Sequence, residues 1–381
     1  MVRIFKNIVI LFIFVLFTNT CAQQTAQNKI INFSEVDSLI FNSIEDQAFP
    51  GAVLLIWHSG KTLYKKGYGK FTYSDTSSVV TAETIFDIAS LTKVIATTTA
   101  AMICYERNLF SLDDPVKKYL PEFGVNGKES VSIKNLLLHN SGLPAFKQFY
   151  KNYSIADDVI RDIYASRLNY NPGTKTVYSD LGMIVLAKVI EKVSGQHFDE
   201  FCRKEIFVPL QMNSTLFNPP DSLKYKIAPT EIDGYWRNRL IWGEVHDETA
   251  SLLNGVAGHA GLFSTADDIK KLLINFIISD SGGKKSIFKK ETIKLYTTRY
   301  SDESTRALGW DTKSEENSSA GSLFDISSFG HTGFTGTSVW IDPTRDLIVI
   351  FLTNRVHPSR ENRKLNKLRP LLHDAVIKAI K

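Results

Sequence analysis

Two segments near opposite ends of the chain have the apolar pattern of buried β-hairpins, whereas the long region between them has the pattern of helices. The first hairpin combines the runs 52–57 and 62–64. The second combines 339–341 and 347–352 around an Asp342-Pro343 turn. Hairpins so far apart bury their apolar faces by pairing in one sheet. We therefore expect an α/β (α+β) fold in which one antiparallel β-sheet is flanked by helices and carries an inserted all-α lobe.

Apolar residues at helical spacing predict an opening helix near 36–44 and a closing helix over 365–380. We expect one catalytic domain, residues 34–381. Its sheet-containing part should combine about 34–110 with 255–381, and its helical lobe should cover about 111–254.

Residues 1–22 have the pattern of an export signal. Arg3 and Lys6 precede an unbroken apolar run at 8–17, and small and polar residues follow it. A membrane-spanning helix needs about 20 apolar residues, and this run is about half that length. We expect an exported protein, periplasmic or in the cell envelope, with a disordered leader over 23–33.

Cys21 stands where a lipoprotein signal places its acylated cysteine, so it is a candidate lipid anchor. The preceding Thr18-Asn19-Thr20 matches a lipobox poorly, and cleavage by an ordinary signal peptidase is the alternative. The other two cysteines, Cys104 and Cys202, each lie in an apolar stretch. We interpret them as buried thiols, with a disulfide between them as the alternative.

The charge composition argues against nucleic acid as a partner. The 45 Lys and Arg residues nearly balance the 40 Asp and Glu residues, and no basic stripe is interleaved with aromatic residues. The basic stretches at 284–285, 289–290 and 360–369 are interpreted as solvated faces.

Three Ser-x-x-Lys strings begin at Ser90, Ser281 and Ser286. The last two lie in a polar loop, where lysine stays hydrated. Ser90 opens a predicted helix that runs into an apolar interior, and Lys93 would face the same side of it. A serine nucleophile needs a neighbouring base, and lysine can be that base where burial lowers its pKa. The alternative is an N-capping serine with a surface lysine.

Two further segments have patterns that suit catalysis. Tyr178 follows a turn at 170–173, and its phenol could share a proton with a lysine as general base and acid. The alternative is a half-buried packing tyrosine. The segment 331–338 is rich in small residues, so a substrate backbone could lie along it and its N–H groups could stabilise an oxyanion. A glycine-rich bend is the alternative.

Together, Ser90-x-x-Lys93, Tyr178-Ser179-Asp180 and His331-Thr332-Gly333 resemble the serine penicillin-binding-protein-like family. This family includes the class C β-lactamases, D-alanyl-D-alanine carboxypeptidases and related esterases. Three other strings are also similar to the family: 49–52, 136–144 and 258–264. The resemblance as a whole spans roughly residues 35–380.

The resemblance implies a role for each matching residue. Ser90 would form an acyl-enzyme, Lys93 and Tyr178 would move protons, and the N–H groups of Ser90 and Phe334 would form the oxyanion hole. The remaining matching residues would contact substrate: Asp180, His331, Thr332 and Gly333. No metal or organic cofactor is implied.

The chain departs from the family pattern at two positions, because many members carry Asn at Asp180 and Lys at His331. An ionised Asp180 cannot donate a hydrogen bond to a substrate carbonyl, and near Lys93 it favours the ammonium form. A neutral His331 attracts a substrate carboxylate less than lysine does. Weak action on β-lactams is therefore expected.

Three other histidines, one of them followed by an acidic residue, could look like metal ligands, but their spacing is irregular and no cysteine or second carboxylate supports the pattern. We interpret them as residues that shape loops near the cleft: His139, His246 with Asp247, and His259.

The leading hypothesis is a serine acyl-hydrolase that acts on a small-molecule ester or a D-amino-acid peptide of the cell envelope. A true β-lactamase and a catalytically silent penicillin-binding-like envelope protein are the alternatives, and intact Ser90, Lys93 and Tyr178 argue against the silent one. An α/β-hydrolase is disfavoured because the sequence has no Gly-x-Ser-x-Gly string.

Overall fold

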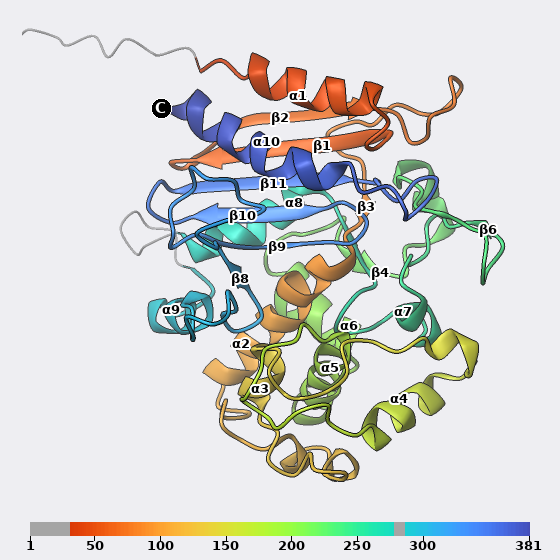
Figure 1. Cartoon of the computed structure of the whole chain (residues 1–381), viewed down its shortest axis with the longest axis vertical. Helices are drawn as coiled ribbons and strands as arrows, with labels where there is room; N and C mark the ends of the chain where they lie inside the picture. Colours follow the sequence, from red (N-terminus) through yellow and green to blue (C-terminus); the bar gives the residue numbers. More distant parts are fainter. Residues whose placement is uncertain (1–30, 278–285) are drawn as a thin grey trace, which may run out of the picture. The chain divides into compact units, whose positions relative to one another are not determined.

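A six-stranded antiparallel sheet forms the centre of the fold in the computed structural model, which describes residues 31–277 and 286–381 (Figure 1). The order of its strands joins the two ends of the chain: β2 (Lys61–Gly69), β1 (Gly51–His58), β11 (Leu347–Thr353), β10 (Ser338–Asp342), β9 (Phe329–Thr332) and β8 (Asp311–Thr312). Ala52 of β1 lies opposite Thr353 of β11. The antiparallel sheet expected from the two hairpins is confirmed.

Helices cover both faces of this sheet, so β11 is buried along its whole length and β1 along nearly all of it. Figure 1 shows α10 (Leu365–Ile380) in front of the sheet and α8 (Ala266–Leu273) behind it. The opening helix, α1 (Ser34–Glu45), packs against α10 and β2. Alternate residues of β1, such as Val53 and Leu55, point into the main apolar core.

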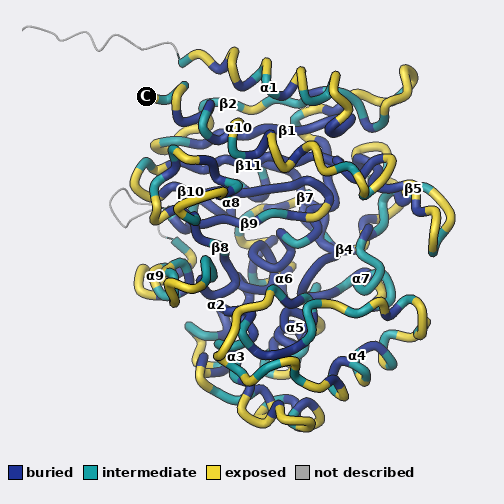
Figure 2. The backbone as a smooth tube through the Cα atoms, in the orientation of Figure 1, coloured by how far each residue is buried: buried dark blue, intermediate teal, exposed yellow. Residues whose placement is uncertain are grey.

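In the sequence, the helical region lies between the N-terminal and C-terminal strands of the sheet. It is organised around α5 (Asp180–Ser194). Ser179 caps the start of α5 by accepting the N–H of Gly182, and Gly195, with a φ of 67°, ends it. Figure 2 shows that α5 and the central strands contain much of the buried backbone. Its helical neighbours are α2 (Thr99–Glu106), α3 (Ile133–Leu137) and α6 (Phe198–Cys202).

The remaining elements are short and lie mainly around the cleft and the edges: β3 (Phe86–Asp87), α4 (Ala156–Ala165), β4 (Leu216–Phe217), β5 (Ile232–Asp233), β6 (Arg239–Leu240), α7 (Glu248–Leu252), β7 (Leu262–Ser264) and α9 (Lys290–Thr297).

The N-terminal predictions fall largely outside the described residues. These are the export signal 1–22, the lipid anchor at Cys21 and most of the leader 23–33. Residues 33–381 form one compact unit, and its division into two parts stays a prediction. No helix among the described residues is long and apolar enough to cross a membrane. Cys104 and Cys202 are both buried and free, as expected.

Candidate active site

Ser90 lies in a tight turn, Ala89–Leu91, that follows β3. Ala89 has a φ of 46°, the left-handed region that residues other than glycine rarely adopt. The buried Asp87 carboxylate fixes this turn, because it accepts the N–H of Ala89 at 2.8 Å and that of His246 at 2.7 Å. The hydrogen bonds of the Asp87 carboxylate to the N–H groups of Ala89 and His246 therefore stabilise the strained backbone at Ala89.

Lys93 lies on a π-helical segment, Lys93–Thr98, that leads into α2, and its side chain is fully buried. Its Nζ lies 3.0 Å from Ser90 Oγ and 2.9 Å from the carbonyl of His259. A third partner, Asp180 Oδ1, lies 2.7 Å away. The alternative of an N-capping serine with a surface lysine is therefore wrong.

The charge of Lys93 differs from the sequence expectation. Burial disfavours the ammonium, but Asp180 and Tyr178 outweigh it and raise the pKa of Lys93 above its usual value. An ammonium has three N–H groups and no lone pair, and here each faces an acceptor. In this state Lys93 orients Ser90 Oγ and cannot take its proton.

Tyr178 completes the group, with its ring between those of His139 and His331 at centroid distances of 4.6 and 5.8 Å. Burial raises the pKa of the Tyr178 phenol, although Lys93 opposes that rise. The phenol interacts with both Lys93 and Ser90, so it is placed to receive the Ser90 proton once the Lys93–Tyr178 pair has lost one proton.

The segment after β9 brings Phe334 beside Ser90. Thr335 and Thr337 donate to the carbonyls of Asp87 and Ile88 at 2.7 and 3.0 Å, which ties this segment to the turn that holds Ser90. A Cβ on Gly333 would stand 2.6 Å from the Ile88 carbonyl, so the close approach requires glycine there.

The N–H groups of Ser90 and Phe334 have no hydrogen-bond acceptor within the described part of the chain. Both residues line the cleft. Two unpaired donors beside a serine hydroxyl suit a developing oxyanion.

The predicted cleft-shaping residues all lie around this site. His139 Nδ1 accepts the N–H of Ser179 at 3.1 Å, and burial holds the pKa of His139 well below its usual value. His246 stacks on Phe334 at 5.7 Å. His259 Nε2 bonds to Asp247 at 2.9 Å, and its carbonyl accepts from Lys93.

The cleft has two arms that share Ser90, Tyr178 and Phe334. One, the arginine arm, is a cavity of about 340 Å³ that these groups also line: His331, Thr332, Gly333, Arg306, Arg355, Arg363, Asn366 and Arg369, with Asp311 as its acidic residue. The other, the aromatic arm, has about 560 Å³ and is lined chiefly by these residues: Phe146, Tyr150, Tyr235, His246, Asp180, Asp247 and Glu248.

Two donors of the arginine arm are buried without partners. Arg306 Nη1 and Arg369 Nε have no hydrogen-bond acceptor among the described residues. His331 Nδ1 donates to the Thr332 carbonyl at 2.8 Å, so Nε2 of the neutral ring is an acceptor. Burial, with Arg306 and Lys93 nearby, holds the pKa of His331 well below its usual value, so the ring is neutral. The guanidinium groups of Arg306 and Arg369 make this arm positively charged, which suits an anionic substrate group.

Sequence reasoning missed Arg306, Asn366 and Arg369. The stretch 360–369 was expected to be a solvated face, and this is wrong for Arg369, which is 8% exposed and donates to the carbonyls of Gly333 and Thr337. It is also wrong for Arg360, which pairs with Glu231 and Glu248. No local pattern distinguishes these arginines from surface ones, because their partners come from remote segments.

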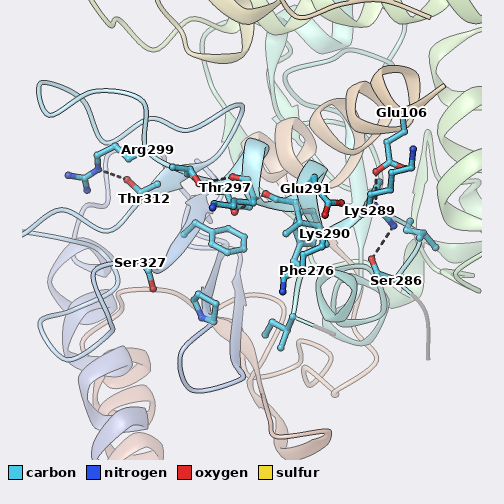
Figure 3. Close-up of a pocket in the computed structure, with 18 of the residues that line it drawn as sticks. Glu106, Phe276, Ser286, Lys289, Lys290, Glu291, Thr297, Arg299, Thr312 and Ser327 are labelled. Atoms are coloured by element: carbon cyan, nitrogen blue, oxygen red, sulfur yellow. Dashed lines mark hydrogen bonds between the residues drawn. The ribbon is translucent and has the colours of Figure 1, made fainter. Parts of the chain in front are cut away.

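A larger cavity, about 850 Å³, lies away from Ser90 between α9 and the β8–β9 edge of the sheet (Figure 3). The second Ser-x-x-Lys alternative, at Ser286, borders this cavity. There Ser286 Oγ donates to the carbonyl of Asn275 at 2.8 Å, and Lys289 is exposed rather than buried. This serine therefore has no base like that of Ser90; Ser281 lies outside the described residues.

The fold and the buried serine–lysine pair are those of a serine hydrolase. The chain belongs to the beta-lactamase family, whose model matches residues 36–373. The resemblance found in the motifs is thus confirmed.

Two relatives match along most of their length. A protein of Escherichia coli (strain K12) provisionally named D-alanyl-D-alanine carboxypeptidase is 33% identical over 364 residues, which cover 86% of this chain and 83% of the relative. The N-acetylmuramyl-L-alanine amidase of Bacillus subtilis (strain 168) is 35% identical over 368 residues, which cover 88% and 83%.

Among solved structures, EstCE1, a hydrolase with promiscuous acyltransferase activity, superposes with a TM-score of 0.73. It is 22% identical, and the match covers 90% of this chain and 97% of that one. This likeness concerns the fold.

Proposed function

We propose that the protein hydrolyses small esters or D-amino-acid peptides of the cell envelope through an acyl-enzyme on Ser90. One observation carries the proposal: a fully buried Lys93 Nζ lies 3.0 Å from Ser90 Oγ, beside two unpaired N–H groups. The names of the two relatives, a carboxypeptidase and an amidase, support an envelope substrate.

The reaction steps follow from which group holds each proton. The reactive form has lost one proton from the Lys93–Tyr178 pair. Ser90 Oγ attacks the scissile carbonyl while its proton passes to this pair, and the oxyanion is held by the N–H groups of Ser90 and Phe334. The pair then protonates the leaving oxygen or nitrogen as its bond to carbon breaks. Water then attacks the acyl carbon and gives a proton to the pair. The pair passes that proton to Ser90 Oγ as its bond to the acyl carbon breaks and the acid is released.

The leaving group belongs in the arginine arm. Tyr178 would protonate the leaving atom, and its ring lies against His331 and Arg306, whose guanidinium carbon is 5.0 Å from the ring centroid. Arg306 and Arg369 carry the buried donors without partners. A leaving group with a free carboxylate, such as a C-terminal amino acid, fits this arm. The acyl group would then occupy the aromatic arm.

Covalent labelling tests the proposal. A fluorophosphonate and a fluorescent penicillin, applied side by side, should label the wild-type chain on Ser90 as read by peptide mass spectrometry. Ser90→Ala should lose labelling and turnover, and its melting temperature should stay close to that of the wild type. Ser286→Ala is the matched control and should label normally. Labelling that survives in Ser90→Ala would refute the assignment.

Export is part of the same proposal and rests on the sequence pattern of residues 1–22. The mass of the mature chain from a bacterial host distinguishes cleavage before Cys21 with lipid attachment from cleavage by an ordinary signal peptidase. A full-length, unprocessed chain in the cytoplasmic fraction would contradict export.

A further inference from the structure

The Asp180 carboxylate has two different environments. Its Oδ1 lies 2.7 Å from Lys93 Nζ, whose side chain has no exposed surface, whereas 27% of the Asp180 side chain is exposed. The exposed part therefore lies away from Lys93, in the aromatic arm that Asp180 lines. Among the described residues, no other side chain bonds to this carboxylate.

The aromatic arm presents carboxylates but no unpaired cation among its described lining residues. Two further carboxylates line it, Asp247 and Glu248. Its two cations are already paired, Lys147 with Asp162 and Arg360 with Glu231 and Glu248. A substrate that displaces water from the arm therefore meets the Asp180 carboxylate, whose one ion pair among the described residues is with Lys93.

This geometry restricts the acyl group. The Asp180 carboxylate accepts hydrogen bonds and donates none. It repels a carbonyl or ether oxygen and binds an N–H or O–H group. Asp180 Oδ1 lies 2.7 Å from Lys93 Nζ, which lies 3.0 Å from Ser90 Oγ. The carboxylate is therefore near enough to Ser90 for a substituent on the carbon next to the scissile carbonyl to reach it.

We propose that Asp180 selects acyl groups that carry a hydrogen-bond donor, an amine or a hydroxyl, on the carbon next to the scissile carbonyl. The inference rests on the proposed acyl-enzyme at Ser90. It assigns to the aromatic arm a substrate class, α-hydroxy or α-amino acyl compounds, and to Asp180 a role in specificity besides its pairing with Lys93.

Three p-nitrophenyl esters with one common leaving group test the inference: those of D-lactate, D-alanine and O-methyl-D-lactate. The first presents a hydroxyl, the second an amine and the third no donor. We expect the wild-type kcat/KM for at least one donor-bearing ester to exceed that of the methyl ether by about 10- to 100-fold, the range for an unsatisfied buried polar group. Of the D-lactate and D-alanine esters, the one with the higher kcat/KM shows whether Asp180 prefers a hydroxyl or an amine.

Asp180→Asn is the decisive variant, because an amide both donates and accepts. The ratio of donor-bearing ester to methyl ether should fall towards one. Comparing two esters within one variant cancels the effect of the substitution on Lys93. Glu205→Gln, which removes a carboxylate that pairs with Arg107 outside the cleft, should keep the wild-type ratio.

The outcomes separate the two proposals. A wild-type ratio near one, or a ratio that persists in Asp180→Asn and so reflects only the size of the methyl group, overturns the inference and leaves the Ser90 mechanism intact. Turnover that is unchanged in Ser90→Ala, or absent for all three esters, overturns the proposed function itself.

Discussion

The two arms of the cleft share Ser90, Tyr178 and Phe334 but have opposite chemistry. The arginine arm contains buried donors without acceptors, on Arg306 and Arg369. The aromatic arm contains ring faces and carboxylates, and its cations are already paired. The difference indicates a polar orientation for the substrate, with an anionic leaving group at one end and a donor-bearing acyl group at the other.

Lys93 serves both arms, so its substitution should have the largest effect. Lys93→Arg keeps a cation but cannot release a proton at usable pH. We expect kcat to fall by roughly 10³-fold or more for neutral and for carboxylate-bearing substrates alike, as happens when a catalytic group that acts as part of a unit is lost. Steady-state kinetics on both substrate types checks this. Near-normal turnover would remove Lys93 from proton transfer.

Arg306 should affect one arm alone. Arg306→Gln should lower kcat/KM for a peptide with a C-terminal carboxylate by about 10- to 100-fold, the loss of a charge-assisted hydrogen bond. Hydrolysis of a neutral p-nitrophenyl ester should change little. Arg299→Gln is the matched control, because Arg299 bonds to Thr312 away from the cleft (Figure 3). Equal losses on both substrates would show that the arms do not differ in this way.

β-Lactams test both arms together, because they carry a carboxylate and an acyl amide carbonyl. The sequence predicts weak binding of the β-lactam carboxylate because His331 replaces a lysine. In the structure, Arg306 supplies a positive charge in that arm, so the expected weak action on β-lactams depends on the mismatch between Asp180 and the acyl amide carbonyl. We expect ready hydrolysis of short-chain nitrophenyl esters and slow turnover of nitrocefin. Asp180→Asn with His331→Lys should shift the ratio of catalytic efficiencies towards nitrocefin by about 1–3 kcal/mol. Faster turnover of nitrocefin than of ester by the wild type would contradict this interpretation.

The pH dependence follows from the raised pKa of Lys93. The reactive form has lost a proton from the Lys93–Tyr178 pair, so kcat/KM should rise with pH. The Asp180 carboxylate stabilises the protonated pair, and its removal lowers the pKa of the pair. In Asp180→Asn the midpoint of the acid limb should therefore move to lower pH by roughly one pH unit or more. A move to higher pH would show that Asp180 does not set the charge of Lys93.

The smallest expected effect concerns the oxyanion hole that both arms share. Thr335→Val removes the hydrogen bond to the Asp87 carbonyl and should reduce the free energy of unfolding by about 1 kcal/mol. It should lower kcat more than it changes KM, because the Phe334 N–H loses its fixed distance from Ser90. Thermal melting and ester kinetics measure both, with Thr344→Val, on the remote β10–β11 turn, as control. An unchanged kcat with a lower melting temperature would limit Thr335 to a structural role.

The sequence was sufficient for elements whose residues lie close together along the chain. Period-two and apolar runs predict β1, β10 and β11, and helical spacing predicts α1 and α10. The Ser90–Lys93 contact follows from a separation of three residues. The remaining features depend on distances between remote segments.

The charge of Lys93 is an example. The opposing influences of burial and Asp180 can both be named from the sequence, but their balance is decided by a 2.7 Å contact. Arg306 and Arg369 come from a polar loop and a basic stretch that resemble ordinary surface until the fold places them at one cavity. Nothing in the type of residue 89 predicts its left-handed backbone, since alanine has no preference for it.

The hydrogen bonds from Thr335 and Thr337 to the turn that holds Ser90 join positions nearly 250 residues apart in the chain. During synthesis, a ribosome has released the serine, the lysine and the tyrosine long before it releases Phe334. A nascent chain therefore has a nucleophile without an oxyanion hole, and its catalytic power arises only when the final hairpin docks. Synthesis and activation are thus separated in time by the order of the polypeptide itself.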